Sequence, residues 1–393
     1  MKTNIYFDNA ATTPVRKEVY DEILPYFIQY YGNASSVYTI ARESKKALEK
    51  AREQVAKALN ANIDEIYFTA GGSESDNFAL KGIAEAMEKK GKHIITTQIE
   101  HHAILHTCEY LQQRGFEITY LPVDEYGKIS LEELKNAIRK DTILISVMFA
   151  NNEIGTIQPI KEIGAIAKQK GIYFHTDAVQ AVGHVKIDVK EMNIDLLSLS
   201  GHKICAPKGI GAIYIKKGVA INPLIHGGAQ EKRRRAGTEN IAGIVGLGKA
   251  IELANEEIEQ NATKVSALRD KLINGILEKI PYSKLNGHPT DRLPGNCNIS
   301  FEFIEGESML LLLDSKGIAA SSGSACTSGS LDPSHVLLAI GLPHEKAHGS
   351  LRMTLEHYNT EKEVDVVLEE LPAIVSKLRD MSPLYETFLK QQK

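Results

Sequence analysis

The stretch LLSLSGHK, residues 196–203, decides the fold, because an apolar run ends there in small and polar residues and then in a lysine. The run predicts a short buried strand that delivers Lys203 to its carboxyl end. Most lysines are solvated surface charges. A lysine just past a buried strand is instead partly desolvated, which lowers the pKa of its ammonium group and makes the amine available as a nucleophile.

A second apolar run, GIYFHTD at 171–177, ends in the carboxylate of Asp177. Open α/β sheets bind ligands outside the carboxyl ends of their strands, so we expect Asp177 and Lys203 at one edge of a sheet. Two such strand ends suit pyridoxal phosphate (PLP), for which a lysine forms the Schiff base and an aspartate pairs with the pyridinium nitrogen. Taken alone, this pair of residues is a weak indication.

Strand and helix patterns alternate around these two runs. Strands are expected near 65–69, 93–97, 117–122, 142–148, 172–176, 195–199 and 210–215, and helices near 74–89, 101–114, 130–139 and 160–170. This alternation predicts an α/β fold with a mostly parallel, seven-stranded sheet covered by helices on both faces.

A long helical stretch, 238–280, precedes a second alternating region. There we expect strands at 297–303 and 349–354, and helices at 307–316, at 333–340 and from about Thr360. The sequence therefore predicts a large domain, 15–255, and a smaller α/β domain formed by 1–14 and 256–393.

The composition is that of a globular protein without a dominant charge. The 393 residues are 43% hydrophobic and 24% charged, with a formal net charge of −4. No global basic field indicates nucleic acid, and no run approaches the about 18 apolar residues of a membrane span. Four cysteines in so long a chain make no disulfide framework, and a CxxC zinc pair is missing. We expect a reduced, cytoplasmic protein without a metal, nucleic-acid or membrane partner.

Two polar loops follow predicted strands and open helices. TAGGSESDN, 69–77, places Gly72 and Ser73 where glycines let the backbone approach an anion and a helix N-terminus supplies free N–H groups. An ordinary capped helix start explains this loop about as well. In EHHAILH, 100–106, His102 and His106 have the spacing of a metal pair, but no third ligand is apparent. His101 at a strand end suits stacking on an aromatic cofactor and proton transfer instead.

Three further groups carry reactive or charged side chains. The small-residue loop AASSGSACTSGS, 319–330, contains Cys326, which we expect to be exposed and reactive only if its thiol pKa is lowered locally. Arg352 lies within a predicted strand and suits a two-point contact with a carboxylate. The basic cluster EKRRRAGT, 231–238, lacks interleaved aromatic residues and indicates an anion-binding loop or a subunit contact. Cys108 and Cys297 lie in regular or apolar contexts and are expected to be structural.

Ten stretches, taken in order, make the chain resemble the cysteine desulfurases of the nitrogen-fixation and iron–sulfur-assembly type, which are PLP enzymes of fold type I. The matching stretches are DNAATTP (8–14), GNASS (32–36), TAGGSESDN (69–77), EHHAIL (100–105), NNEIG (151–155), HTDAVQ (175–180), SGHK (200–203), RRRAGT (233–238), SSGSACTSGS (321–330) and SLRMTL (350–355). The resemblance covers essentially the whole chain, so it implies the PLP-dependent transferase fold of type I.

The resemblance also implies a role for each matching residue. Lys203 would form the Schiff base, His101 would stack on the PLP ring and act as an acid–base, and Cys326 would form the persulfide. The remaining assignments are Asp177 for the ring nitrogen, Gln180 for the ring hydroxyl, Gly72, Ser73, Ser200 and His202 for the phosphate, Thr238 for the phosphate of the neighbouring subunit, and Asn152 and Arg352 for the substrate carboxylate, with Asn152 also beside the cofactor.

The implied reaction converts L-cysteine to L-alanine and leaves the sulfur on Cys326, for an iron–sulfur scaffold or a tRNA-thiolation enzyme. A homodimer with shared sites is implied by Thr238. A selenocysteine lyase would share nearly all of these features. Another PLP-dependent β-lyase or an aminotransferase would not need Cys326. One departure stands near the lysine, where Cys205 and Ala206 replace a common Tyr-Gly pair.

Overall fold

A seven-stranded sheet forms the centre of the larger part of the chain, in a computed structural model that describes residues 5–322 and 333–392. Its strands are β2 (Ile66–Thr69), β3 (His93–Thr97), β4 (Glu117–Leu121), β5 (Thr142–Ser146), β6 (Tyr173–Asp177), β7 (Leu196–Ser200) and β8 (Gly211–Ile215). They lie in the order β2-β8-β7-β6-β5-β3-β4, and only β8 runs antiparallel to its neighbours. The predicted α/β class and mostly parallel sheet are confirmed.

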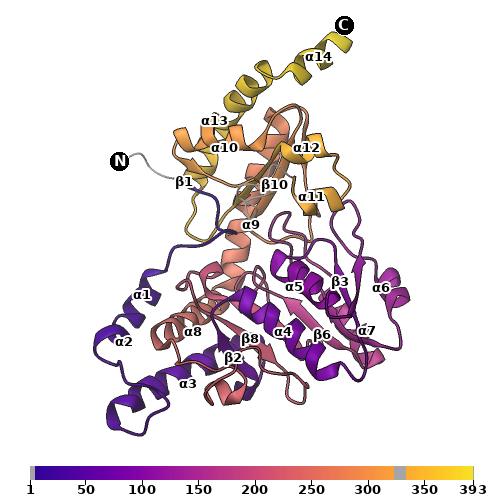
Figure 1. The fold of residues 1–393 in the computed structure, drawn as a ribbon. Coiled ribbons are helices and arrows are strands. Elements are labelled where there is room, and N and C mark those ends of the chain that lie inside the picture. Colours follow the sequence, from indigo (N-terminus) through magenta and orange to yellow (C-terminus); the bar gives the residue numbers. More distant parts are fainter. Residues whose placement is uncertain (1–4, 323–332, 393) are drawn as a thin grey trace.

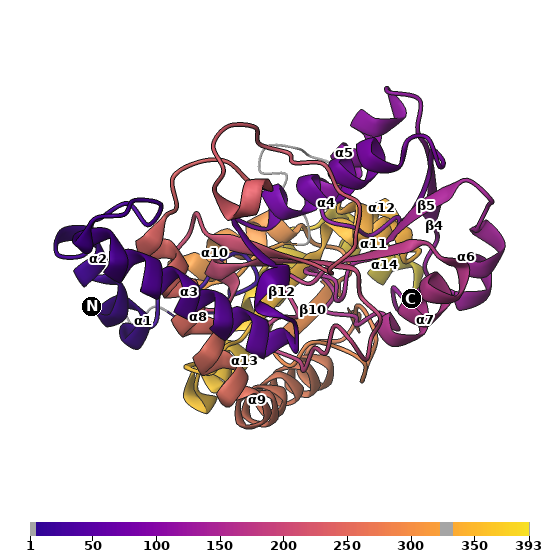
Figure 2. The ribbon, with the colours of Figure 1, turned by 90° about the horizontal axis from the view of Figure 1, so that it is seen from below.

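Helices cover both faces of this sheet, as Figures 1 and 2 show. The helices of this part of the chain are α1 (Lys17–Ile23), α2 (Pro25–Ile28), α3 (Thr39–Leu59), α4 (Gly72–Met87), α5 (His102–Gln112), α6 (Leu131–Ala137), α7 (Ile160–Lys170) and α8 (Ile241–Glu256), of which α1 and α2 pack against α8. Successive side chains of a strand point to opposite faces. In β7, Leu197 and Leu199 join an apolar core that includes α3, α7 and α8, whereas Leu196 joins a second core with α4 and α5.

A smaller group of elements packs at one end of the large sheet (Figure 1). Strands β9 (Ser283–Leu285), β10 (Asn296–Phe301) and β12 (Ser350–Thr354) form an antiparallel sheet, and β1 (Ile5–Tyr6) pairs with β11 (Ile318–Ala319). The helices are α9 (Ile258–Lys279), α10 (Gly306–Ser315), α11 (His335–Ala339), α12 (His344–His348), α13 (Glu361–Asp380) and α14 (Pro383–Gln391). This group has its own apolar core, to which the N-terminal Ile5 and Phe7 also belong.

The structure refines several expected boundaries. The long helical stretch of 238–280 divides into α8 and α9 at Glu257, whose φ of −97° and ψ of 1° interrupt the helix. Helix α1 begins at Lys17 and is separated from α2 before Pro25, which has no backbone N–H to donate. The domain boundaries at 15 and 255 remain a prediction.

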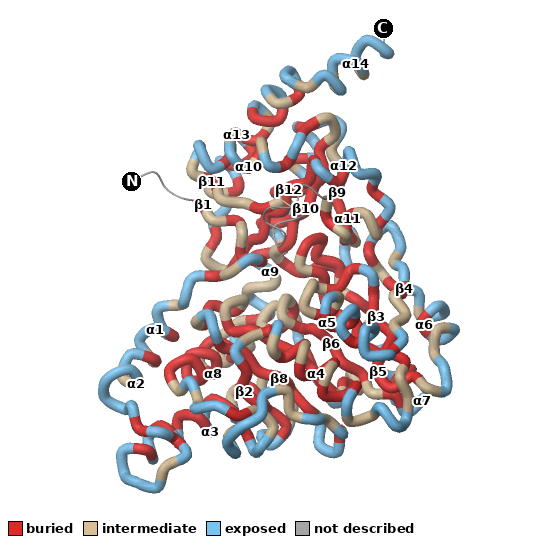
Figure 3. The backbone as a smooth tube through the Cα atoms, viewed as in Figure 1, coloured by how far each residue is buried: buried red, intermediate tan, exposed pale blue. Residues whose placement is uncertain are grey.

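Burial follows the two sheets and the helices against them. Figure 3 shows that α1, α2, the loop after them and α14 are largely exposed, and α14 has no buried residue. Among residues 5–322 and 333–392, no helix combines the length and apolarity needed to cross a lipid bilayer.

The charged contact between His184 and Glu356 is among those that join the two groups of elements. His184, in the turn region after β6, lies 2.5 Å from Glu356, which follows β12. Burial lowers the pKa of His184, but the charge and hydrogen bond of Glu356 outweigh it, so the pKa of His184 is raised overall. The pKa of Glu356 is lowered, because the two neighbouring histidines outweigh the opposing effect of its burial.

We predict that Glu356→Gln lowers the free energy of unfolding by about 2 kcal/mol near pH 6, because it removes a charged hydrogen bond. A raised histidine pKa stabilises the fold fully below the unfolded pKa and loses this effect as the pH rises through the folded pKa. The difference between wild type and variant should therefore shrink as the pH rises above the ordinary pKa of histidine and through the raised pKa of His184. Urea unfolding of the cofactor-free proteins across this range measures it, and a difference that grows with pH would contradict the pairing.

Candidate active site

A cavity of about 250 Å³ opens at the carboxyl edge of the large sheet. Its lining combines the ends of β6 and β7, the starts of α4 and α5, the N-terminal segment and one residue of the small sheet. The lining residues are Ala10, Ala11, Gly72, Ser73, Asp76, His101, Met148, Ala150, Asn152, Asp177, Val179, Gln180, Ser200, His202, Lys203 and Arg352. Ten of the site residues expected from the sequence thus meet in one cavity.

Lys203 is delivered by β7 and the 3₁₀ turn η2 (Gly201–Lys203) that follows it. Its Nζ donates to the backbone oxygens of Ala10 and Ala11, at 2.5 and 2.8 Å. The same N-terminal segment accepts a hydrogen bond at Ala10 O from Gln180 Nε2, at 3.0 Å. The segment therefore holds the lysine head and Gln180 together at the cavity wall.

Asp177 ends β6 and is buried. Burial raises the pKa of Asp177 to about 6, against the opposing effects of the Val179 N–H and the Lys203 charge. A second carboxyl, Asp76, is also buried in the cavity wall, and its Oδ1 has no hydrogen-bond partner among the described residues. Burial and the neighbouring Asp177 raise the pKa of Asp76 well above its usual range. Two buried acids this close favour a cationic partner such as a pyridinium nitrogen.

Sequence reasoning missed Asp76. A signal was present, because Asp76 lies four residues after Gly72 and residues at this spacing share one face of a helix. Within TAGGSESDN the carboxylate reads as an ordinary polar helix residue, so only its burial reveals its place in the site.

The phosphate positions form a cradle at the start of α4. Gly71 precedes the helix at φ 153°, and the helix has no side-chain cap, so its first N–H groups face the cavity without a competing acceptor from a cap. A Cβ on Gly72 would come within 2.6 Å of Val179 Cγ2. Ser73, Ser200 and His202 complete the donor set around this backbone. The cradle fits a phosphate group, and with Asp177 it fits PLP.

His101 caps α5, and its Nδ1 accepts a hydrogen bond from Ala103 N at 3.1 Å. This contact assigns the ring proton of the neutral histidine to Nε2. Burial, followed by the charge of Lys203, lowers the pKa of His101 to about 4. The ring is therefore neutral near pH 7, which suits stacking on a ring, and its Nε2–H remains to donate a hydrogen bond.

The two residues expected to bind the substrate carboxylate lie on the small sheet and in the loop after β5. Arg352 is 2% exposed, and its Nη1 donates to Asn152 O at 3.2 Å. Its Nη2 pairs with Asp8 at 3.0 Å. Asp8 was not predicted, because it lies far from Arg352 in the sequence and their pairing depends on the N-terminal segment returning to β12.

Comparison with known proteins agrees with this geometry. The aminotransferase class-V family model matches residues 5–367. Cysteine desulfurase IscS of Methanosarcina thermophila is 66% identical over 97% of this chain and 94% of its own length, and the enzyme of Clostridium botulinum is 62% identical over 100% and 99%. A NifS-like protein of known structure is 41% identical with a TM-score of 0.91, over 96% of this chain and 100% of its own.

The chain belongs to the cysteine desulfurases of the class-V aminotransferase family. A second solved relative, the apo cysteine desulfurase of Thermococcus onnurineus NA1, is 27% identical with a TM-score of 0.85, over 95% of each chain. The expected family, fold type I and dependence on PLP are confirmed.

Of the two remaining expected desulfurase residues, one lies elsewhere and the other lies outside the described residues. Thr238 lines a separate cavity of about 60 Å³ together with Arg235 and Glu239. Cys326 lies outside the described residues. The described residues on either side of it are held at the site, because Ser321 exchanges backbone hydrogen bonds with Arg352 at 2.7 and 3.0 Å, and Ser334 donates to Glu153.

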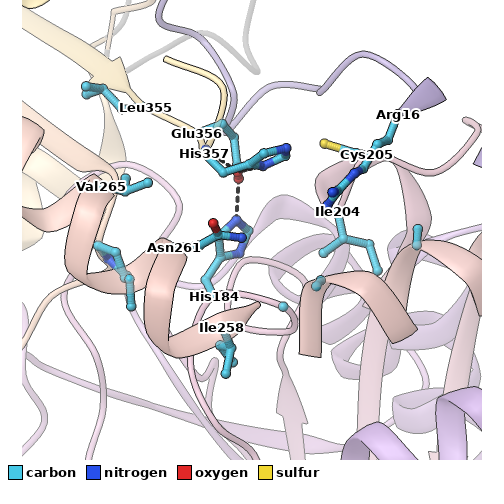
Figure 4. Close-up of a pocket in the computed structure, with 15 residues that line it drawn as sticks. Arg16, His184, Ile204, Cys205, Ile258, Asn261, Val265, Leu355, Glu356 and His357 are labelled. Atoms are coloured by element: carbon cyan, nitrogen blue, oxygen red, sulfur yellow. Dashed lines mark hydrogen bonds and ion pairs between the residues drawn. The ribbon is translucent and has the colours of Figure 1, made fainter. Parts of the chain in front are cut away.

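The other cysteines are buried away from the lysine head. Cys205 lines another cavity together with Arg16, His184 and Glu356 (Figure 4). Burial raises the pKa of the Cys205 thiol to about 12. Cys108 and Cys297 are buried as well. None of these thiols is suited to act as a thiolate near neutral pH.

The histidines of EHHAILH contact one another through their rings. The rings of His102 and His106 stack at 5.0 Å, and His335 lies 4.8 Å from His102. Among the residues that the structure describes, no group of three or more His, Cys, Asp or Glu side chains is placed to hold a metal ion.

We predict that Gly72→Ala weakens PLP binding about tenfold, because the added Cβ would clash with Val179 and displace the helix start that forms the phosphate cradle. Equilibrium dialysis of the cofactor-free proteins with PLP measures the affinity. Thermal unfolding without PLP controls for the fold. Unchanged affinity would show that the phosphate does not sit at this helix start.

Proposed function

We propose that the protein converts L-cysteine to L-alanine and carries the removed sulfur as a persulfide on Cys326. The observation that supports this most directly is the single cavity shared by Lys203, Asp177, His101 and Arg352. A nucleophilic amine, a ring-nitrogen partner, a neutral histidine and a carboxylate clamp are the groups that such a reaction requires.

Different residues around the cavity bind different parts of the cofactor. In this proposal Gly72, Ser73, Ser200 and His202 hold the phosphate at the start of α4. Asp177 pairs with the ring nitrogen, Gln180 contacts the ring hydroxyl, His101 stacks on the ring, and Lys203 forms the covalent attachment. Bound PLP supplies an electron sink for a carbanion at the substrate α-carbon.

The substrate is oriented by its carboxylate. Arg352 lines the same cavity as the residues assigned to the cofactor and, with Asn152, binds the carboxylate of L-cysteine. Lys203 Nζ then removes the α-proton. Because the carboxylate is fixed, the side-chain sulfur is directed away from the clamp, where an external thiolate can approach it.

Sulfur transfer uses the Cys326 thiolate as nucleophile. Its Sγ attacks the substrate sulfur, so that an S–S bond forms while the substrate C–S bond breaks. The electron pair of the C–S bond stays with the three-carbon fragment. His101 and Lys203 return the protons, and the fragment leaves as L-alanine.

We predict that Cys326→Ser still binds L-cysteine but releases less than about 1% of the wild-type alanine, because only the sulfur nucleophile is lost. Mass spectrometry of wild type after one turnover without reductant should find a 32-Da sulfur adduct on Cys326, one sulfur atom. Cys205→Ser serves as the matched thiol control and should keep near wild-type activity.

A sulfur adduct on Cys205 with Cys326 unmodified would overturn the assignment. Lys203→Ala provides the second arm, because it should abolish alanine formation while the protein still folds. If Lys203→Ala formed alanine at the wild-type rate, the proposed PLP mechanism would be excluded.

We also propose that the protein is a homodimer with shared active sites. Thr238 lies outside the cavity of its own chain, which is what a residue that serves the other subunit requires. A run of apolar side chains on α1, α2 and the following loop is exposed and supports a covered surface: Tyr20, Leu24, Phe27, Ile28, Tyr31, Val37 and Tyr38.

We predict a dimer by light scattering at micromolar concentration. Phe27→Glu should shift the protein toward monomers, since a charge on this surface would be desolvated in an interface. Leu311→Glu, at an equally exposed apolar side chain of α10, is the control and should remain dimeric. A wild-type monomer would exclude shared sites.

The finer assignments follow from the same reaction. A persulfide requires an acceptor protein, and we propose an iron–sulfur scaffold or a tRNA-thiolation enzyme. We place the protein in the cytoplasm, where a free thiol such as Cys326 stays reduced. We divide the chain into a large domain, 15–255, and a small domain of 1–14 and 256–393, with the clamp and Cys326 on the small one.

A further inference from the structure

The guanidinium of Arg352 is already paired with a carboxylate of its own chain. Asp8 Oδ1 lies 3.0 Å from Nη2, and Asn152 O accepts from Nη1 at 3.2 Å. Nε is buried and has no hydrogen-bond partner among the described residues. The arginine side chain is 2% exposed, whereas that of Asp8 is 20% exposed. The residue that is proposed to hold the substrate carboxylate therefore carries an internal counter-ion.

A buried guanidinium without a carboxylate partner is strongly unfavourable. Asp8 relieves this when no substrate is bound. The same negative charge lowers the attraction that Arg352 exerts on an incoming carboxylate. Substrate and product each present one carboxylate to this arginine, so the counter-ion weakens the binding of both.

We propose that Asp8 is a positioning residue and the resident counter-ion of Arg352, which keeps the empty clamp in place and limits how tightly it holds L-alanine, so that the product leaves. This inference rests on the proposed function, because it takes L-alanine as the product. Asp8 does not line the cavity and acts only through Arg352.

The backbone around Asp8 is fixed independently of its side chain. Thr354 N donates to Phe7 O at 2.7 Å, and Ala11 N donates to Asp8 O at 3.0 Å. Tyr6 Oη also donates to Asp8 O, at 3.1 Å. Because these contacts use backbone oxygens, a change of the Asp8 side chain to asparagine leaves the segment anchored.

Glu153 is the other carboxyl near Arg352. It is buried, and its Oε2 accepts a hydrogen bond from Ser334 rather than from the arginine. Burial raises the pKa of Glu153 to about 7, against the hydrogen bond from Ser334 and the charge of Arg352. Asp8 is thus the carboxylate that is directly paired with the guanidinium.

The test compares L-alanine with ethylamine, which is L-alanine without its carboxylate. Both are titrated into the PLP-loaded protein, and binding is measured by calorimetry. We expect Asp8→Asn to bind L-alanine about tenfold more tightly than wild type does and to bind ethylamine equally well. In turnover of L-cysteine, kcat and KM should fall together, and L-alanine should become a stronger inhibitor.

Two variants control this result. Asp8→Glu keeps the charge and should keep L-alanine affinity near that of wild type. Glu257→Gln removes the carboxylate of another arginine pair, with Arg16 at 2.8 Å and outside the cavity, and should change neither affinity. Thermal unfolding of the PLP-free proteins reports the fold. If Asp8→Asn does not fold, Asp8→Ser is used in its place, because this variant also removes the negative charge.

A merely structural role would weaken both ligands or neither. An unchanged ratio of L-alanine to ethylamine affinity, or weaker L-alanine binding, in folded Asp8→Asn overturns the inference and leaves the proposed function standing. If wild type neither prefers L-alanine to ethylamine nor releases L-alanine from L-cysteine, the proposed function fails, and the inference fails with it.

Discussion

The parallel pairing of β6 with β7 is the constraint on which the site depends. Asp177 stands opposite Ser198 in this pair, so both strands reach the same edge of the sheet within a few residues. β7 then continues through Ser200 and the η2 turn to Lys203. Because the register is fixed by apolar side chains buried on both faces, the carboxylate and the amine cannot separate without unpacking the two cores.

The sequence predicted the features that depend on short stretches of neighbouring residues. The run at 196–203 predicted a buried strand with a lysine at its end, and the order of ten stretches indicated the family. It did not predict Asp76, whose burial depends on how α4 packs, or Asp8, whose partner Arg352 is 344 residues away. The small strands β1, β9 and β11 were missed for a related reason. With two or three residues each, they have no periodicity to detect, and only their pairing partners make them strands.

Buried charge is concentrated at this sheet edge. Asp76, Asp177, Glu100 and Glu153 are all buried, and burial raises the pKa of each. Lys203 is the cationic side chain that lowers the pKa of Asp177, and Arg352 does the same for Glu153. Such a set of acids is costly in an apolar interior unless cations or protons compensate it. In the proposed assignment, a pyridinium ring against Asp177 would add a positive charge beside Asp177 and Asp76.

The N-terminal segment contacts both of the cationic residues that are proposed to act on the substrate. Its Ala10 and Ala11 carbonyls accept from Lys203, while Asp8 holds Arg352 and Asn9 Nδ2 donates to Thr354 O at 2.7 Å. A span of four residues therefore contacts both Lys203, which is proposed to take the α-proton, and Arg352, which is proposed to bind the carboxylate. Since Lys203 belongs to the large sheet and Arg352 to the small one, this segment sets the separation between them. In a substrate with extra atoms between the carbon that loses its proton and the carboxylate, these two groups would not match the separation of Lys203 and Arg352. Such a substrate would have to displace the N-terminal segment, which is hydrogen-bonded to both residues.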